Sequence, residues 1–505
     1  MAASGGMLLT VVTLLAGWAC MWPLRPTLGW GYHIAAYPVG LVLWPLAAAV
    51  LSPFGSPFDS GAVLAGYVAL AAVVWLLARS IGGSLPPAQG QVPAWTYLAW
   101  GTLLVAASAI VSLTRWTSAA YDSVFHYEAW GQWLHQTGTV SVQIIGDYGI
   151  FIPTIHAVDT LLGAGWTSVP YPLLSLHVLA VVLAATYGWA RPRLGPPFSR
   201  LLAVGTVVFL AATTPYLHHT LYVHSHMITA AYLVLAIWCI QRAYLGAADD
   251  ADLPGSGHAS MSWLFVAGLA SAGFALTRTD GIAYVIVPII VAALLRLETG
   301  GSRPAYVLFL ATVAVPVIVV YGSALLDLGV WDGRKLTGSR AIITLCVLTL
   351  AGVATVAVDA VPRVRRLLAE QRRGLFLVVA ANILALLGLA AMRPDGFAEA
   401  GRNMLINLFS TGGYRLLWFV ILGIILIPFL WRYRWSPARW PVYLLYTIGQ
   451  FFVVAVLVHG VAHPGRLSPA DSFTRVAFHV VPLAFWYAGI VGTTLVQAVR
   501  RSPST

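Results

Sequence analysis

Charged residues are scarce in this chain. Asp, Glu, Lys and Arg make up 9% of its 505 residues, whereas a soluble domain carries about 25%. Hydrophobic residues make up 59%, and the mean hydropathy is +0.82. Most of such a chain cannot face water, which excludes an ordinary soluble enzyme.

Cysteine and lysine are also rare. The three cysteines, Cys20, Cys239 and Cys346, lie inside apolar runs and form no CxxC motif, which argues against a disulfide framework or a cysteine metal cluster. Lys335 is the single lysine, so the net charge of +11 comes from arginine. In an apolar chain this excess fits arginines at cytoplasmic span ends better than nucleic-acid binding. The N-terminus lacks a basic n-region, so we interpret it as a span rather than a signal peptide.

Apolar runs of about 20 residues, the length that crosses ~30 Å of hydrocarbon as a helix, recur throughout the chain. Their continuity favours helices over the alternating strands of a barrel. We therefore predict an all-α polytopic transmembrane bundle of about fifteen spans. Their approximate limits are 5–22, 34–52, 61–79, 95–114, 171–190, 201–217, 227–243, 262–277, 281–296, 304–326, 341–358, 374–392, 415–431, 440–459 and 476–498.

The distribution of arginine predicts the orientation. With the N-terminus outside, the inside loops hold 18 of the 28 basic residues, including the run 363–373 and Arg500–Arg501. The same assignment puts 11 of 17 acidic residues and 10 of 13 histidines outside. The positive-inside rule does not require histidines to be outside, so we predict a working site at the outer face.

The longest outer segment, 115–169, carries the first group of candidate residues. A helix predicted from Tyr121 to Gln136 places Asp122, His126 and Trp130 on one face, while Glu128 points elsewhere. A turn at 146–149 contains Asp147 and Tyr148, and a short amphipathic helix, 153–162, is predicted to lie at the membrane interface.

Asp122 follows directly on the outer end of a span. Two interpretations are open. A carboxylate at the boundary can act as a general base that takes a proton from a hydroxyl acceptor. Alternatively, it is an N-cap or an interfacial charge that orients the loop.

The second outer segment, 215–227, is rich in histidine: His218, His219, His224 and His226. A zinc site needs three or four suitably spaced ligands. The favoured interpretation is that these histidines are ordinary polar loop residues. An intermediate interpretation is that they hydrogen-bond to a phosphate or a sugar. No residue is assigned as a metal ligand, although a divalent metal stays open.

The third and fourth outer segments each carry an arginine. Arg278 and Asp280 lie between two closely spaced spans, where they form either an anion site or an ion pair that staples the hairpin. Arg475 and His479 are one helical turn apart at the start of the last span and can both donate to phosphate oxygens. The alternative for Arg475 is an interfacial side chain that snorkels.

These four segments, in this order, resemble the GT-C superfamily of membrane glycosyltransferases, which includes the protein O-mannosyltransferase, aminoarabinose transferase and mycobacterial arabinosyltransferase families. The matching features are Asp122 in a large first outer loop, the stretch 268–281 (GLASAGFALTRTDG), the stretch 397–414 as an outer re-entrant helix, and Arg475 to Pro482. The resemblance covers roughly 95–497. It implies additional N-terminal helices over 1–94 and a GT-C-like catalytic module over 95–505. The chain departs from the pattern where histidines replace a second acidic residue.

The resemblance implies transfer of a sugar from a polyprenyl-phosphate carrier to an acceptor hydroxyl of a glycan, lipid or protein, at the outer face of the cytoplasmic membrane. Asp122 would be the base. Residues implied in substrate binding are His126, Glu128, Asp147, Tyr148, His224, His226, Arg278, Asp280, Arg475 and His479. The rival predictions are a secondary transporter, which favours repeats and broken helices at mid-membrane, a lipid-handling membrane protein, and a structural subunit.

Overall fold

A computed structural model gives the arrangement of the chain. It describes residues 2–54, 58, 61–82, 94–114, 128–138, 149–162, 169–221, 225–246, 257–278, 280–328, 349, 353, 357–410, 414, 416–430, 439–462 and 476–501. Within these ranges the chain is helical and contains no strand. The all-α class predicted from the sequence is confirmed.

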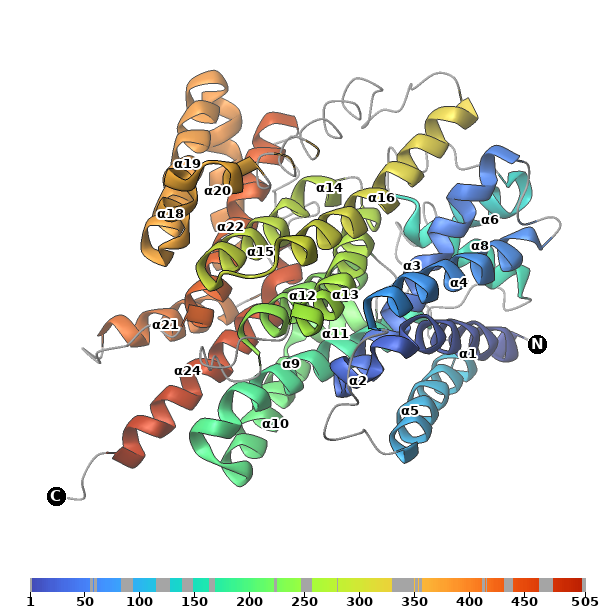
Figure 1. Cartoon of the computed structure of the whole chain (residues 1–505), viewed down its shortest axis with the longest axis horizontal. Helices are drawn as coiled ribbons and strands as arrows, with labels where there is room; N and C mark the ends of the chain where they lie inside the picture. Colours follow the sequence, from blue (N-terminus) through green and yellow to red (C-terminus); the bar gives the residue numbers. More distant parts are fainter. Residues whose placement is uncertain are drawn as a thin grey trace.

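The helices, with short 3-10 elements marked η, follow one another in a bundle (Figure 1). They are α1 (Ala2–Met21), η1 (Trp22–Leu24), α2 (Arg25–Leu28), α3 (Trp30–Leu51), η2 (Ser52–Phe54), α4 (Ala62–Gly82), α5 (Ala94–Leu113), α6 (Ala129–Thr137), α8 (Phe151–Leu161), α9 (Pro170–Leu194), α10 (Pro196–Ala212), α11 (Thr214–Leu221), α12 (Ser225–Leu245), α13 (Gly257–Leu276), α14 (Gly281–Tyr284), α15 (Ile286–Thr299), α16 (Arg303–Leu328), η4 (Val358–Ala360), α18 (Pro362–Ala369), α19 (Gln371–Met392), α20 (Pro394–Phe409), α21 (Leu417–Leu430), α22 (Arg439–Ala462), η6 (Ala477–Val480) and α24 (Val481–Arg501).

Among the described residues, eleven helices are long and apolar enough to cross a membrane, or up to twelve if a bent pair counts as one span. The chain is therefore a multi-pass helical membrane protein. Fourteen of the fifteen predicted spans coincide with described helices, and the remaining one, 341–358, lies almost entirely outside the described ranges. The total number of spans stays a prediction.

Three predicted spans are not single straight helices. The span predicted over 201–217 is the pair α10 and α11, which bend by 68° at Thr213. The span predicted over 281–296 is interrupted at Val285, between α14 and α15. The last span begins with η6 before it continues as α24. Two of these breaks, at α14 and η6, adjoin the candidate site described below.

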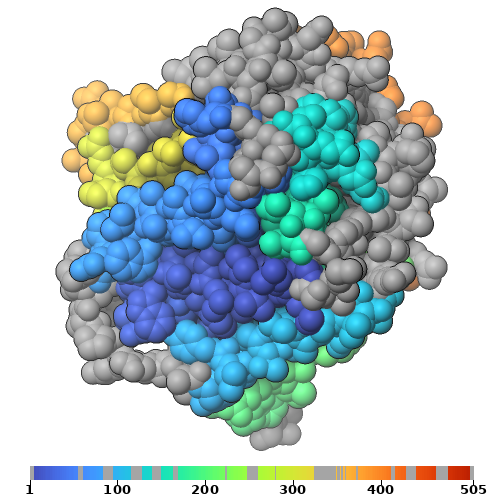
Figure 2. All heavy atoms as spheres, turned by 90° about the vertical axis from the view of Figure 1, so that its right-hand side faces the viewer, coloured from blue at the N-terminus to red at the C-terminus, as the bar shows by residue number. Residues whose placement is uncertain are grey.

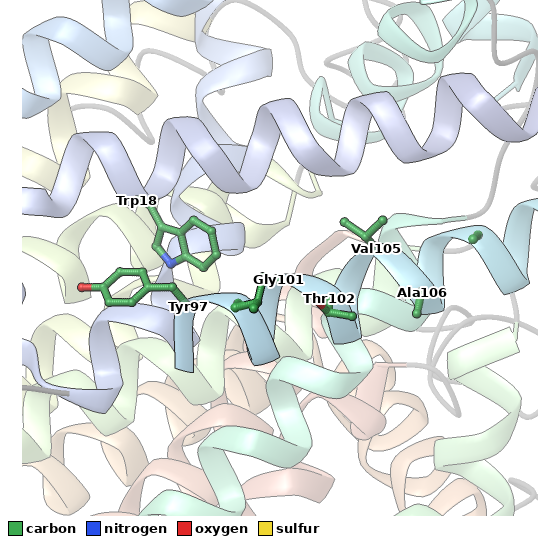
Figure 3. A pocket seen from close by; sticks show the side chains of 8 residues that line it. Trp18, Tyr97, Gly101, Thr102, Val105 and Ala106 are labelled. Carbon is green, nitrogen blue, oxygen red and sulfur yellow. The ribbon is translucent and has the colours of Figure 1, made fainter. Parts of the chain in front are cut away.

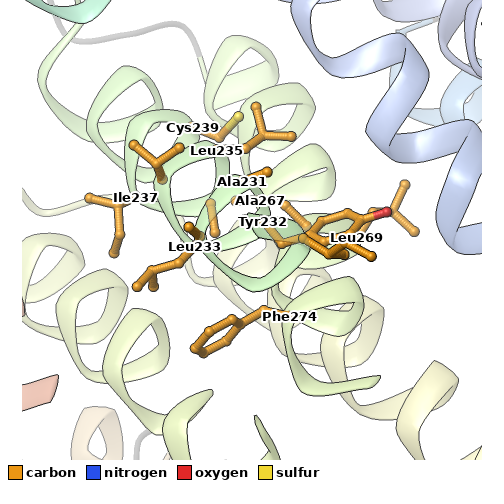
Figure 4. Packing of buried hydrophobic residues seen from close by; sticks show 14 of the residues in the cluster. Ala231, Tyr232, Leu233, Leu235, Ile237, Cys239, Ala267, Leu269 and Phe274 are labelled. Carbon is orange, nitrogen blue, oxygen red and sulfur yellow. The ribbon is translucent and has the colours of Figure 1, made fainter. Parts of the chain in front are cut away.

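Helices α12 and α13 lie at the centre of the bundle and pack closely along their lengths (Figures 1 and 4). Lipid offers no hydrophobic driving force between spans, so small residues that let helices approach decide such contacts. Ala231 of α12 and Ala267 of α13 lie in this contact. A Cβ on Gly273 would come within 2.5 Å of the Tyr232 ring, so that ring fits only against glycine.

The N-terminal helices share the core of the rest of the chain. Helix α3 is buried along most of its length and contacts α8, α9, α13 and α16. Tyrosines of other helices also bond to its backbone, since Tyr232 donates to the Pro38 carbonyl at 2.7 Å and Tyr67 to the Gly40 carbonyl at 3.1 Å. At the surface, α1 lies between α4 and α5 (Figure 2). Over the described residues, the N-terminal helices thus belong to the same buried core as the later ones.

Helix ends predicted to share the inner side do meet. Arg500, near the end of α24, donates to the Leu194 carbonyl at the end of α9 (3.0 Å). Tyr443, near the start of α22, donates to Glu298 at the end of α15 (2.5 Å). Both contacts join segments that the arginine distribution placed on one side of the membrane. Which side this is remains part of the proposal below.

Candidate functional site

Three outer segments predicted from the sequence converge on one buried polar cluster. The second contributes Ser225 and His226 at the start of α12, the third contributes Arg278 and Asp280 between α13 and α14, and the fourth contributes His479 in η6. His459, near the end of α22, joins them. We call this set the Arg278 cluster: Ser225, His226, Arg278, Asp280, His459 and His479. Each member lies at or near the end of a helix.

The centre of the cluster is an ion pair between Arg278 and Asp280. Nε of Arg278 donates to Oδ1 of Asp280 at 2.8 Å, and Nη2 donates to Oδ2 at 3.2 Å. This two-bonded geometry fixes the plane of the guanidinium. Both side chains are mostly buried, with exposed fractions of 15% and 13%. The stapled hairpin, one of two interpretations of the sequence, is therefore observed, and it leaves the anion-site interpretation open because it also orients the arginine.

A tight turn brings the two partners together. Asp280 stands at the N-cap position of α14, but its carboxylate makes no capping bond there and serves Arg278 instead. The Gly281 amide donates to the Arg278 carbonyl at 3.0 Å. A Cβ on Gly281 would lie 2.7 Å from the Phe274 carbonyl oxygen, so the turn fits against α13 only with glycine at this position.

Two histidines extend the ion pair into a chain of hydrogen bonds. Nη1 of Arg278 contacts Ser225 Oγ at 3.2 Å and Nε2 of His226 at 3.5 Å, and Nδ1 of His226 lies 2.9 Å from Nε2 of His479. A guanidinium can only donate, so Nε2 of His226 accepts. Nδ1 of His226 then carries the hydrogen that it donates to His479. Both rings are fully buried, with exposed fractions of 0% and 1%.

The sequence argument singled out neither Ser225 nor His459. His459 has its Nε2 3.8 Å from Oδ2 of Asp280. It follows an apolar span and has no acidic or basic neighbour in sequence. The one available signal was a histidine at the predicted outer end of a span.

Electrostatics favour the ionised form of Asp280. Burial by itself would raise the pKa of this carboxyl, but the charge and hydrogen bonds of Arg278, with His459 and His479 nearby, hold the pKa well below its usual range. A carboxylate next to a bidentate arginine stays charged at neutral and mildly acidic pH. The cluster thus carries a fixed ion pair beside three histidines.

A residue of the first outer segment, Gly149, packs against this cluster. Gly149, with φ of +77°, lies so close to the turn that a Cβ would be 2.9 Å from the Leu276 carbonyl oxygen and 3.0 Å from the Arg278 nitrogen. A side chain at this position would be opposed both by the backbone conformation and by the close contact. Gly149 therefore packs directly against the backbone that leads into Arg278.

The two short helices of the first outer segment are present. Helix α6 covers the end of the predicted 121–136 helix, and α8 corresponds to the predicted 153–162 helix. The predicted position of α8 was wrong: Phe151 to Asp159 are buried, and α8 packs against α6 and α3 rather than lying on the membrane surface. A Cβ on Gly131 of α6 would lie 2.4 Å from the His156 Cβ. The polar face that suggested an interfacial helix faces neighbouring helices instead.

Glu128 lies at the start of α6, where it accepts a hydrogen bond from Gln132 at 3.3 Å. Partial burial raises the pKa of its carboxyl, opposed by that hydrogen bond. Several other predicted site residues lie outside the described ranges and stay predictions: Asp122, His126, Asp147, Tyr148, His224 and Arg475.

Metal ligation was left open by the sequence. Within the described part of the chain, no three side chains of His, Cys, Asp or Glu are grouped so that they could hold a metal ion. Cys20 and Cys239 are buried and unpaired, as expected for packing residues.

Comparison with protein-family models, curated proteins and solved structures finds no match for this chain. Its function must therefore be inferred from its own residues.

Proposed function

We propose that the chain is a membrane glycosyltransferase that moves a sugar from a polyprenyl-phosphate carrier to an acceptor hydroxyl at the outer face of the cytoplasmic membrane, with inversion at the anomeric carbon. One observation supports this more than any other. Segments far apart in sequence bring Arg278, Asp280 and three histidines into one buried group at helix ends. Burying charge in a membrane protein is costly and usually marks a functional site.

The donor would present a phosphate at the membrane edge while its polyprenyl tail lies among the spans. Arg278, fixed by Asp280, would direct its guanidinium at that phosphate together with the His226–His479 pair. Negative charge grows on the phosphate oxygen as the bond to the sugar breaks. Positioned donors of this kind stabilise that charge without reorganising during the reaction.

The acceptor would need a base more than the donor needs an acid, because phosphate is already a good leaving group. Asp122 would remove the proton of the acceptor hydroxyl. The acceptor oxygen then forms a bond to the anomeric carbon from the face opposite the phosphate. The bond between that carbon and the phosphate oxygen breaks, and its electron pair stays on the phosphate.

The direct test is sugar transfer by the purified protein in proteoliposomes, with a panel of polyprenyl-phosphate sugars and hydroxyl acceptors. We expect release of polyprenyl phosphate that depends on the acceptor and is lost in the Arg278→Gln variant. Absence of transfer with every donor, while the same protein retains no polyprenyl phosphate through purification, would contradict the proposal.

A secondary transporter is the second candidate, and one observation favours it. The chain is broken beside the polar cluster, at α14 and at η6, and α10 and α11 bend by 68° nearby in sequence. Transporters place such breaks at their substrate sites. Substrate counterflow in the same proteoliposomes, without a covalent change in the substrate, would favour this candidate over the glycosyltransferase.

A further inference from the structure

A lateral groove runs between α1 and α5, away from the Arg278 cluster. Its volume is about 680 Å³. Its lining is apolar and mostly small, and Trp18 and Tyr97 stand at one end (Figure 3). The residues that line it are Trp18, Tyr97, Leu98, Gly101, Thr102, Val105, Ala106 and Ala109.

The aromatic end of the groove is built from several rings. Trp18 and Tyr97 meet edge to face with their centroids 5.7 Å apart, and the centroid of the His33 ring lies 4.3 Å from that of Tyr97. Trp22 lies next to Tyr97 at 6.3 Å and carries the guanidinium of Arg25 over its ring at 3.6 Å. The apolar groove is therefore followed by the aromatic rings, and the rings are followed by the exposed guanidinium of Arg25.

This order matches the parts of a phospholipid. Tryptophan and tyrosine prefer the headgroup level of a bilayer, and arginine near the membrane surface attracts anionic lipid. Along α5, the lining from Tyr97 to Ala109 extends about 18 Å at 1.5 Å per residue. That is close to about 15 Å, half of the hydrocarbon core. The length fits one chain of one leaflet.

We propose that this groove holds one acyl chain of an anionic phospholipid whose phosphate lies at Arg25. The site is separate from the proposed transferase site and does not depend on that function. A lipid fits better than a second protein copy because the lining itself includes exposed apolar residues, such as Leu98 at 74%, on a membrane-spanning helix. The predicted topology places the Arg25 end at the cytoplasmic leaflet, where anionic lipid is concentrated.

The proposal can be tested by native mass spectrometry of the full chain. The chain is titrated with phosphatidylglycerol and, separately, with phosphatidylcholine that carries the same acyl chains. We expect one phosphatidylglycerol to bind about fivefold more tightly, the effect of one arginine near the surface. Arg25→Gln should remove this preference. Ala106→Phe, at an exposed position inside the groove, should weaken the binding of both lipids.

Two matched variants serve as controls. Arg193 also stacks on a tryptophan, Trp189, at 3.7 Å on α9, so Arg193→Gln should keep the preference. Ile110 is exposed on α5 but does not line the groove, so Ile110→Phe should bind both lipids as the unaltered chain does. Equal binding of the two lipids, or unchanged binding in Ala106→Phe, would overturn the proposal. So would a dimer that Ala106→Phe dissociates, since the occupant would then be a second copy.

Discussion

Nδ1 of His226 lies 2.9 Å from Nε2 of His479, although the two residues stand 253 positions apart in the chain. This contact joins the start of α12 to η6 and continues, through Nε2 of His226, to Arg278. The hydrogen-bond direction set by the arginine makes the two rings one unit. A change to either ring should therefore affect the other.

For the histidine pair, we expect His226→Phe and His479→Phe to reduce transfer by similar factors, on the order of 10²-fold. The double variant should lose little more than either single one, because the rings act together. Initial rates in proteoliposomes measure this. His177→Phe is the matched control, since that ring is also buried but stacks on Tyr37. Multiplicative losses in the double variant would mean that the rings act independently.

For the ion pair, Arg278→Gln should cost about 3–5 kcal/mol of stability, because it leaves a buried carboxylate without its cation. The double variant Arg278→Met, Asp280→Leu should recover most of this stability but no activity. Thermal unfolding in detergent, together with the transfer assay, separates the two effects. A double variant as unstable as Arg278→Gln would show that the pair is needed for folding and not for function alone.

The response of the unfolding temperature to acidification should differ between the unaltered chain and Arg278→Gln. The pKa of Asp280 lies below its usual range, so its stabilising contribution is complete above about pH 4 and is lost as pH falls further. Lowering pH from 7 to 5 should leave the ion pair intact. In Arg278→Gln, burial raises the pKa of Asp280, so the same step should increase the unfolding temperature. A fall in that temperature would contradict this account of the carboxylate.

For the attachment of the first outer loop, Gly149→Ala should lower both stability and transfer. The positive φ alone costs about 1–2 kcal/mol with a side chain, and the contact with Leu276 and Arg278 adds to it. Gly300→Ala is the control, because its φ of +68° is similar and no atom lies within 4 Å of its Cβ. The difference between their unfolding temperatures isolates the close contact. Equal decreases in unfolding temperature for the two variants would show that the close contact of Gly149 with Leu276 and Arg278 does not add to stability.

For the proposed base, Asp122→Asn should reduce transfer by about 10²–10⁴-fold while donor binding and folding persist, since the amide keeps the shape and removes the basicity. Glu128→Gln, on the same outer segment, should keep most of the activity. Single-turnover rates and donor affinity, measured together, distinguish chemistry from binding. Near-normal turnover in Asp122→Asn would move the base to Asp147 or to the 218–226 histidines.

For topology, cysteines placed at Gln136 and Gln371, in a chain without Cys20, Cys239 and Cys346, should react with impermeant reagents from opposite sides. Gln136 should be labelled from outside and Gln371 from the cytoplasm, as the arginine distribution predicts. Labelling of Gln136 from the cytoplasm alone would place the Arg278 cluster on the inner side and contradict the proposed reaction.

Fourteen of the fifteen spans predicted from hydropathy coincide with described helices, because each apolar run has to satisfy its own backbone. The same pattern does not reveal where a helix bends, and so the break between α10 and α11 was missed. The predicted topology singled out His226, Arg278, Asp280 and His479, because it places all four at the outer side of the membrane. It could not pair His459 with Asp280, because that contact depends on how α22 packs against α14. The burial of α8 was missed for the same reason, since amphipathicity does not say whether the polar face meets water or protein.

The central place of α3 has a consequence for how the protein is made. Helix α3 leaves the ribosome before α13 and α16, which pack against it. Its contacts with α1 and α4 can form first, while the face that α13 and α16 cover still lacks its final neighbours. The bundle can therefore close around α3 only after these later spans have entered the membrane.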